Sequence, residues 1–490
     1  MNLNVTLISH EMLVVLLGLA VLLVDLWLPA RSKPKLGYAA ALGLGAILLY
    51  SLCSFQIPAG QAEYAFGKMY ILDGQALFFK RFFLLAGLVV LVMSVEFSDR
   101  FHAGVGEFYA LLLFALTGML FASSANDFSL MFVSLELITV TFYVLTSFQR
   151  GRVVSLEAGV KYLIIGALST SFTVFGIALV YGIGGKLNFE ELREVVGQFQ
   201  GNKMFLFGLL LILVGLGFKI AAFPFQIWAP DVYQGAPAPT TAFLAVGSKA
   251  AGFALLLRLL FTAVPDIAAQ WSTLLLAIST ITILYGNLAA IPQRNIKRLL
   301  GYSSISHAGY MLLGIAALSP AGQSAVLFYL GGYLFTVLGA FTVICLVLRQ
   351  LEDEDISAFA GLSQRSPLLA AAMALAMVSL GGIPPLAGFF GKFLLFKAAL
   401  TQAPQQHAYY WAVAAAIFGV VVSLYYYFNV VRVMYWSKDA TDLSPIPASL
   451  PIRACLYACI AGMLFIGIYP NPLVQLASVA VKWVRIDPDK

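Results

Sequence analysis

Charged residues are scarce in this sequence of 490 residues. Asp, Glu, Lys and Arg make up 11% of the chain, whereas 61% is hydrophobic and the mean hydropathy is +0.91. An ordinary soluble domain carries roughly 25% charged residues. So few charges cannot cover a globular surface in water, so the outer surface must face lipid. The composition excludes a soluble fold and predicts an all-α polytopic membrane protein.

Cysteine is also rare, and all four cysteines lie inside apolar segments. Cys455 and Cys459 share one helix face, but neither they nor Cys53 and Cys345 have the His, Cys or carboxylate neighbours of a zinc or iron–sulfur site. We therefore expect the cysteines to be apolar packing residues and predict no metal site in the chain.

Nucleotide-binding motifs are absent from the sequence. No Gly-x-Gly-x-x-Gly follows a strand pattern, no Walker loop occurs, and neither His-x-x-His nor Cys-x-x-Cys spacing is found. The chain by itself has no visible means of handling NADH, ATP, haem or iron–sulfur clusters, so its energy must come from a gradient or from a partner. Its net charge of +6 indicates basic cytoplasmic loops rather than nucleic-acid binding.

Long apolar runs fill most of the chain. The first run lacks the basic n-region and the cleavage site of a signal peptide, so we expect it to be a span. The run at 367–400 is interrupted by Pro384-Pro385 and is expected to be one broken helix. A window of about 19 residues gives fourteen spans: 7–28, 36–55, 76–95, 107–125, 127–149, 155–183, 203–223, 238–261, 271–291, 300–318, 322–348, 367–400, 409–436 and 453–475.

The polar connections between these spans are too short to fold alone, so a single domain is expected. We predict a short surface helix between Lys186 and Lys203 and a solvated acidic loop at 352–355.

Basic residues divide unequally between the two sides of the spans. The richer side is cytoplasmic by the positive-inside rule, which places both termini outside. Lys80 and Arg81 are assigned to the poorer side as loop or interfacial residues. The richer side holds Arg31, Lys33, Lys35, Arg100, Arg150, Arg152, Arg294, Lys297, Arg298, Arg349, Arg365, Arg432, Lys438 and Arg453; the poorer side holds Lys68, Lys80, Arg81, Lys186, Arg193, Lys203, Lys482, Arg485 and Lys490.

A few basic residues remain inside the apolar segments. A charge at the centre of a helix in lipid costs at least ~2.5–3.5 kcal/mol, so it normally faces the protein interior and serves function. Arg258 and Lys397 lie near segment ends, where snorkelling to the interface suffices. The six residues are Lys161, Lys219, Lys249, Arg258, Lys392 and Lys397.

Two of these lysines lie beside prolines. Pro224 forces the helix that carries Lys219 to break or end just after it, and Lys392 follows Pro384-Pro385. Freed backbone groups are tolerated at membrane depth only where protein buries them or a wet cavity hydrates them. Broken helices with charges are therefore typical of ion sites.

Glu136 and His307 each precede one of these lysines by a similar distance. The separations are 219 − 136 = 83 and 392 − 307 = 85. This spacing predicts two five-helix repeats at 107–261 and 271–436, and an odd number of helices inverts the second copy. Three further helices precede the repeats, at 1–106, and one final helix follows, at 453–475. The alternative is a coincidence of two spacings.

The residue types indicate proton transfer. Burial lowers the pKa of a lysine and a nearby carboxylate raises it, so a lysine balanced between the two exchanges its proton near neutral pH. Alternating charge can then pass between Glu136, Lys219, Lys249, His307 and Lys392. For each residue, Lys161 included, the structural alternative is a buried, satisfied ion pair; for His307 it is also a hydrogen bond that packs helices.

These residues stand in long runs that resemble the antiporter-like membrane subunits of respiratory complex I over almost the whole chain. The runs are Gly217-Phe-Lys219-Ile-Ala-Ala-Phe-Pro-Phe-Gln-Ile-Trp-Ala-Pro-Asp-Val-Tyr-Gln-Gly-Ala-Pro237, Gly247-Ser-Lys249-Ala-Ala, Asn295-Ile-Lys-Arg-Leu-Leu-Gly-Tyr-Ser-Ser-Ile-Ser-His307-Ala-Gly-Tyr310 and Gly388-Phe-Phe-Gly-Lys392-Phe.

The resemblance implies fourteen helices with two inverted repeats, and proton pumping coupled to quinone reduction in a distant arm. It implies functional positions at Glu136 on the fifth helix, Lys219 on the broken seventh, Lys249 on the eighth and Lys392 on the broken twelfth; Lys161 and His307 match less decisive positions. It implies no cofactor in this chain, with NADH, FMN, iron–sulfur clusters and quinone in partner subunits. The implied partners are neighbouring membrane subunits, a peripheral redox arm and the lipid of a bacterial inner membrane.

Within that family, Lys392 and the length favour one of three large subunits, because another carries a glutamate on the twelfth helix and the third is longer with a lateral helix. Mrp-type cation/proton antiporters share the fold, but His307 and the tail Gly467-Ile-Tyr-Pro-Asn-Pro472 are less similar to them. A non-pumping scaffold and a direct quinone-binding protein are further alternatives. The hypothesis for a pump is that protonation of Lys219, set by its distance from Glu136, is relayed through Lys249 and His307 to Lys392.

Overall fold

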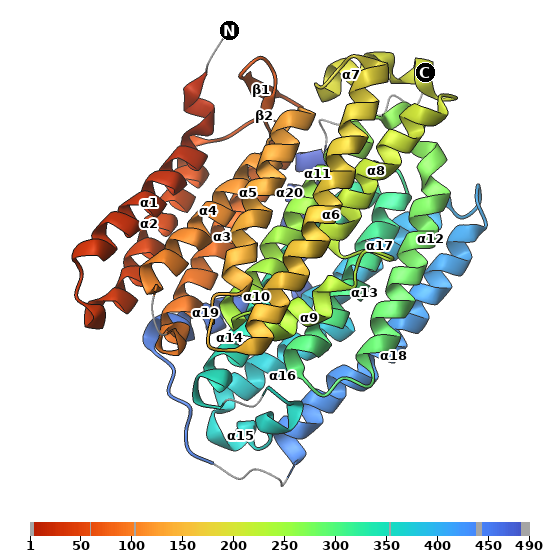
Figure 1. The fold of residues 1–490 in the computed structure, drawn as a ribbon. Coiled ribbons are helices and arrows are strands. Elements are labelled where there is room, and N and C mark those ends of the chain that lie inside the picture. The colour runs from red at the N-terminus through yellow and green to blue at the C-terminus, as the bar shows by residue number, and fades with distance from the viewer. Residues whose placement is uncertain (1–3, 59, 102–103, 352–353, 438–442, 482–490) are drawn as a thin grey trace.

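The computed structural model describes residues 4–481, apart from 59, 102–103, 352–353 and 438–442. Long helices run between two ends of a bundle (Figure 1). The hairpin end carries the antiparallel strands β1 (Ala62–Ala65) and β2 (Tyr70–Asp73) and the short helix α7 (Phe189–Val196). The opposite end, called the basic end below, carries α15 (Leu362–Arg365). Helix α1 begins, and α20 ends, on the hairpin side, as expected for termini on one side.

The apolar segments form helices because a backbone in lipid must satisfy its own hydrogen bonds. Twelve helices in the described part of the chain are long and apolar enough to cross a membrane, so the all-α polytopic class is confirmed. They are α1 (Ser9–Trp27), α2 (Lys33–Ser54), α3 (Gly74–Phe97), α4 (Val105–Ser123), α5 (Phe128–Thr146), α6 (Val153–Gly184), α8 (Lys203–Ile220), the continuous stretch from α10 to η6 (Ala238–Ala263), α12 (Pro265–Ala290), α14 (Pro320–Gln350), α18 (Ala408–Trp436) and α19 (Leu450–Ile468).

Both predicted helix breaks are confirmed. Helix α8 ends at Ile220, one residue after Lys219, and the chain resumes as α9 (Trp228–Gly235). The segment at 367–400 forms α16 (Pro367–Gly381) and α17 (Ala387–Gln402) on either side of the two prolines. If α16 and α17 count as one broken span, adding it and the more polar α13 (Ile296–Ala316) to the twelve gives fourteen crossings, which remain a prediction. The predicted surface helix between Lys186 and Lys203 is α7.

The last predicted span, at 453–475, is two helices instead of one. Helix α19 ends at Ile468 and α20 runs over Asn471–Val481. Tyr469 precedes Pro470, and a residue before proline is disfavoured in the helical region. The β-hairpin was not predicted either.

The eighth span is helical but irregular. Helix α10 (Ala238–Phe243) passes through a π-helical turn, η5 (Leu244–Ser248), into α11 (Lys249–Arg258), and a second such turn, η6 (Leu259–Ala263), ends it. The most apolar stretch of this span is completely buried inside the protein, whereas only 28% of the most apolar stretch of α6 is buried. Single π-turns inside α-helices occur often at functional sites.

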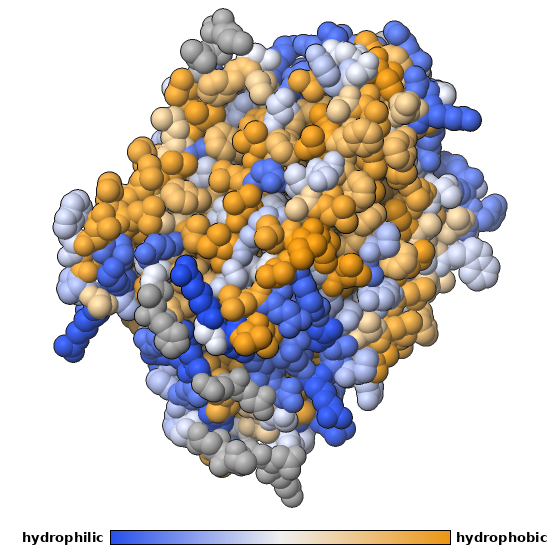
Figure 2. All heavy atoms as spheres, in the orientation of Figure 1, coloured by the Kyte–Doolittle hydropathy of each residue, from blue (hydrophilic) through white to orange (hydrophobic). Residues whose placement is uncertain are grey.

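The outer surface matches a lipid environment. In Figure 2, apolar side chains cover most of the visible face between the two ends, and hydrophilic ones gather towards the basic end. Large apolar residues are exposed on the outer helices, for example Leu163 and Phe175 of α6 and Val421 and Tyr425 of α18. The chain is therefore a multi-pass membrane protein.

Candidate functional site

Lys219 lies buried at the broken end of α8. The helix stops because Ala221 adopts a left-handed backbone (φ 59°) and Pro224 follows. The ammonium Nζ of Lys219 donates to Oγ1 of Thr139 on α5, at 2.9 Å. No carboxylate of the described residues forms an ion pair with it. The lysine is thus held by a neutral hydroxyl.

Glu136 lies one helical turn before Thr139 on α5. Its carboxylate accepts a 2.7 Å hydrogen bond from Oγ1 of Thr170 on α6. Glu136, Thr139, Thr170 and Lys219 line one cavity of about 20 Å³. Such a volume is enough for one water molecule. The predicted partners Glu136 and Lys219 are therefore neighbours across a small polar cavity rather than an ion pair.

Lys249 begins α11, directly after the π-turn η5. Its Nζ donates to the carbonyl oxygen of Ser304 on α13 at 2.6 Å and also contacts the Ser304 hydroxyl. Gly252 lies one turn further along α11 and packs against the aliphatic stem of Lys219. The lack of a side chain at Gly252 therefore brings the helix of Lys249 directly against Lys219.

His307 lies in the buried middle of α13. Its Nδ1 contacts the hydroxyl of Tyr329 on α14, and its Nε2 lies 3.1 Å from the hydroxyl of Tyr427 on α18. The Tyr427 hydroxyl is also 2.5 Å from Oγ of Ser303. Hydroxyl groups thus surround the imidazole on both sides, which suits either direction of proton transfer.

Lys392 lies buried on α17, beside the break in the twelfth span. Helix α16 ends at Gly381, and the next residue, Gly382, has a left-handed backbone (φ 81°), which leaves carbonyl groups free. Nζ of Lys392 donates to the carbonyl oxygens of Leu380, at 2.7 Å, and Gly381, at 3.3 Å. It also lies 5.0 Å from the centre of the Tyr310 ring.

The structure separates two kinds of buried cation. Among the described residues, the ammonium groups of Lys219, Lys249 and Lys392 donate hydrogen bonds to hydroxyl or carbonyl oxygens, and none has an ion pair. Lys80, Arg258 and Lys297, which are also buried, each have a carboxylate partner, and so does the partly exposed Lys161. These pairs are Lys80 with Glu11, Arg258 with Asp73 (2.5 Å), Lys297 with Glu354 (2.9 Å) and Lys161 with Asp231 (2.6 Å).

Two predictions about charged residues are wrong. Arg258 does not snorkel: its side chain is 1% exposed and bonded to Asp73 of β2 and to the carbonyl oxygen of Ser123. Lys80 is not a loop residue but is fully buried on α3, where it contacts Glu11 of α1 and the Tyr70 hydroxyl, at 3.0 Å. The sequence does contain the matching acids, Glu11 near the start of the first predicted span and Asp73 just before the third.

Lys161 and Lys397 have other environments. Lys161, on α6, is 41% exposed and pairs with Asp231 of α9 and with Glu157. Lys397 is exposed, as snorkelling predicts. Three cysteines are buried among apolar residues and Cys53 is exposed. The basic residues Lys438, Lys482, Arg485 and Lys490 lie outside the described residues.

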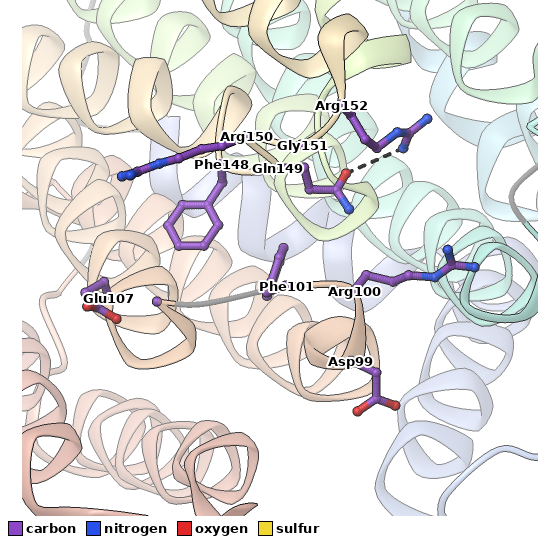
Figure 3. A pocket seen from close by; sticks show the side chains of 10 residues that line it. Asp99, Arg100, Phe101, Glu107, Phe148, Gln149, Arg150, Gly151 and Arg152 are labelled. Atoms are coloured by element: carbon purple, nitrogen blue, oxygen red, sulfur yellow. Dashed lines mark hydrogen bonds between the residues drawn. The ribbon is translucent and has the colours of Figure 1, made fainter. Parts of the chain in front are cut away.

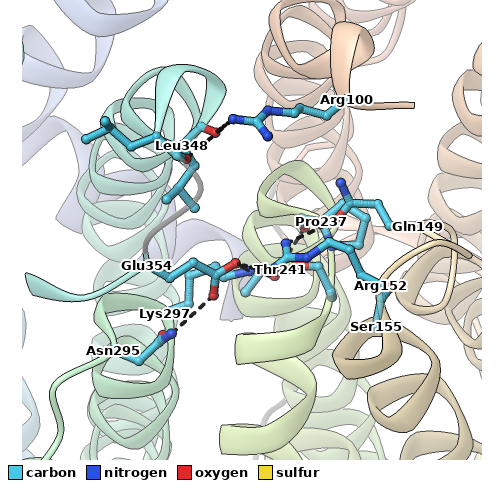
Figure 4. Close-up of polar contacts among 12 residues, drawn as sticks. Arg100, Gln149, Arg152, Ser155, Pro237, Thr241, Asn295, Lys297, Leu348 and Glu354 are labelled. Carbon is cyan, nitrogen blue, oxygen red and sulfur yellow. Dashed lines mark hydrogen bonds and ion pairs between the residues drawn. The ribbon is translucent and has the colours of Figure 1, made fainter. Parts of the chain in front are cut away.

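Two connected cavities open at the basic end. The larger cavity, about 560 Å³, is lined by Arg100, Arg152 and the rings of Phe101 and Phe148. In Figure 3 the side chains of the two arginines point away from these two rings. The smaller, about 190 Å³, shares both arginines and is lined by Glu354. Glu354 pairs with Arg152 at 3.0 Å and with Lys297, and accepts from Asn295 at 3.1 Å (Figure 4).

Glu354 corrects the prediction of a solvated acidic loop. It is buried and joins the start of α6 to the start of α13, although Glu352 and Asp353 lie outside the described residues. Burial alone would raise the pKa of Glu354, but the Lys297 ammonium and the Asn295 amide outweigh burial and hold it below its usual value.

This ion network predicts an acid-sensitive stability. Because the pKa of Glu354 is depressed in the folded state, its stabilisation is complete above the unfolded pKa of about 4.3 and is lost as the pH falls through the folded value. We expect Glu354→Gln to lower the thermal midpoint at neutral pH and to flatten its fall in acid, measured on the purified protein by thermal unfolding over a pH series. The exposed residue Glu63 provides the control, Glu63→Gln; equal profiles for both variants would contradict the assignment.

A helix bundle with buried lysines beside broken helices defines a class of membrane ion carriers. Residues 125–417 match the profile of the family "NADH:quinone oxidoreductase/Mrp antiporter, TM". The chain belongs to this family.

Relatives and solved structures agree along the full length. The chain is 40% identical over 486 residues to NADH-quinone oxidoreductase subunit N of Trichlorobacter lovleyi, covering 99% of this chain and 98% of the relative. Among solved structures, a chain of respiratory complex I from Thermus thermophilus with bound aureothin is 34% identical, with a TM-score of 0.78 over 96% of this chain and 100% of that one. A chain of the Mrp complex from Dietzia sp. DQ12-45-1b shares the fold, at 20% identity and a TM-score of 0.80 over 98% of each chain.

Proposed function

We propose that this chain translocates protons as a membrane subunit of an NADH-quinone oxidoreductase, in the position of subunit N. The observation that carries the proposal is the contrast between paired and unpaired buried cations. Removing the proton from Lys80 leaves Glu11 as an unpaired buried charge, which is costly. Removing it from Lys219, Lys249 or Lys392 leaves neutral hydrogen-bond partners, a hydroxyl or a backbone carbonyl group. These three lysines can therefore change charge without disrupting an ion pair.

The contacts supply an order along which charge can be relayed. Glu136 and Lys219 share one cavity, and Gly252 brings the helix of Lys249 against Lys219. Lys249 is bonded to Ser304, one turn before His307 on α13. Tyr310, one turn after His307, faces Lys392. Each successive pair is thus joined by one helix or one shared neighbour. Lys161, outside this series and partly exposed, is assigned to hold α9 against α6 through Asp231.

The two halves of this relay support the predicted inverted repeats. In residues 105–263 the third long helix, α6, is followed by the broken helix α8–α9, which carries Lys219. In residues 265–436 the third long helix, α14, is followed by the broken helix α16–α17, which carries Lys392. Glu136 and His307 each lie on the second helix of their half. We assign Glu136 and His307 to corresponding positions, and Lys219 and Lys392 to another such pair.

The chain gates protons but does not supply the energy. Moving one charge against 100 mV costs ~2.3 kcal/mol, which a lysine cannot provide by itself. The redox energy is assigned to partner subunits, which we propose hold NADH, FMN, iron–sulfur clusters and quinone. The homologous chains are parts of such multi-subunit complexes by name.

The proposal is tested by purifying the chain with its partners. A C-terminally tagged chain, extracted gently from native membranes, is expected to bring down partner subunits and NADH-dependent quinone reduction that a complex I inhibitor blocks. Recovery of small membrane subunits alone, without oxidoreductase activity, would contradict the proposal and favour a cation/proton antiporter. Labelling of this chain by a photoreactive quinone analogue would instead favour direct quinone binding.

A further inference from the structure

The tail motif Gly467-Ile-Tyr-Pro-Asn-Pro472 forms a third helix break, which the relay described above does not use. Helix α19 stops at Ile468, and α20 starts at Asn471 and packs against α14 and α3. Leu473 of α20 lies against Gly331 of α14. The motif thus ends α19 at a point where Gly467 is buried against other backbone, whereas Ile468 and Tyr469 beside it are exposed.

Gly467 brings this end against the break of the twelfth span. A Cβ atom at Gly467 would overlap the carbonyl oxygen of Pro385 and lie 2.6 Å from the backbone carbon of Leu386. Backbone atoms cannot rotate aside as a side chain can, so any larger residue must displace one of the two segments. On the other side of the same segment, Gly332 of α14 faces Ala387, where a Cβ would lie 3.1 Å away.

The segment held in this way is the one that sets the position of Lys392. Its ammonium is bonded to the carbonyl oxygens of Leu380 and Gly381, which precede Pro385 by five and four residues. A Cβ at Gly382 would lie 2.9 Å from Cδ of Lys392. A shift of the break therefore changes both the acceptors and the space of this lysine.

We infer that Gly467 is a positioning residue for Lys392, through its backbone contact with Pro385 and Leu386. The inference rests on the proposed role of Lys392 in proton transfer. The tail motif is then part of the proton-transfer apparatus, although it touches no proton-carrying group. The groups that face Lys392 are Tyr310 and His307 of α13, and His307 is bonded in turn to Tyr329 of α14 and Tyr427 of α18.

The test compares two glycine variants of the same helix in the assembled complex. Gly467→Ala inserts a methyl group against backbone, whereas in the control Gly462→Ala the nearest atoms belong to the Phe335 side-chain ring. Membrane vesicles are assayed for the amount of assembled complex, for NADH-driven quinone reduction and for protons pumped per NADH over a pH series. We expect Gly467→Ala to lower pumping per NADH by roughly tenfold and to shift its pH profile, because a ~1 Å misplacement can cost up to about 10²-fold.

Pro470→Ala serves as a second variant that adds no overlap. It removes the proline that ends α19 and so relaxes the contact at Gly467. If Gly467→Ala does not assemble, a shifted pH profile in assembled Pro470→Ala supports the inference, and an unchanged profile overturns it. Normal pumping and an unchanged pH profile in assembled Gly467→Ala also overturn it. Failure of the wild-type vesicles to pump would instead refute the proposed function.

Discussion

Replacing Lys219 by methionine is expected to stop proton pumping while the complex still assembles. Methionine fills a similar volume, and the hydrogen-bond partner that Lys219 leaves behind is Thr139, which can also bond within its own helix. Lys219 has no ion pair to lose, and Glu136 keeps its hydrogen bond from Thr170, so the cost in stability is small. The relay, however, loses the group next to Glu136. Protons pumped per NADH in vesicles should fall by at least about tenfold, as for a lost acid–base group.

The matched control is Lys397→Met, which removes an exposed lysine from the same type of apolar segment. It should pump normally. If Lys219→Met assembles and pumps like the wild type, the relay is wrong, and the alternative of a non-pumping scaffold gains support. That alternative predicts that neutralising Lys219 or Lys392 changes stability without changing the proton stoichiometry.

Replacing Lys80 by methionine is expected to have the opposite effect, with a large loss of stability. Glu11 would remain buried beside α3 without its cation, and breaking a buried ion pair on one side costs about 3–5 kcal/mol. Little assembled protein should then be recovered from the membrane, as measured by immunoblot and by thermal unfolding of the purified complex.

The double variant Glu11→Gln with Lys80→Met identifies the cause. It removes both charges together, so most of the assembled protein and its pumping should return. If the double variant assembles but does not pump, the pair carries protons and is not only structural. If Lys80→Met alone is as stable as the wild type, the buried pair contributes nothing.

The main features of the fold and the site could be predicted from the sequence because each has a local cause. Hydropathy gives the spans, since lipid penalises every exposed polar group. Pro224 and Pro384-Pro385 give the two breaks, since proline cannot continue a helix. The scarcity of charge also makes Lys219, Lys249 and Lys392 conspicuous inside apolar runs.

The missed features depend on contacts between distant segments. Lys80 resembles a loop residue until Glu11, 69 positions earlier, is placed beside it because α1 and α3 both pack on α2 and α4. Arg258 and Asp73 are 185 positions apart, and Glu354 meets Arg152 from 202 positions away. The break at Tyr469-Pro470 was local and could have been predicted, but hydropathy averaged over a window concealed it.

The pairing of the structural charges has an electrical consequence for the interior. The ion pairs at Glu11 and Asp73 are each close to neutral at a distance, so they add little fixed electric field inside the bundle. Two unit charges about 10 Å apart interact by roughly 1.7 kcal/mol at an effective dielectric constant of ~20, slightly more than a tenfold change in an equilibrium. Because the fixed field of these ion pairs is small, a proton that binds to or leaves one site measurably changes the protonation equilibrium of the next site.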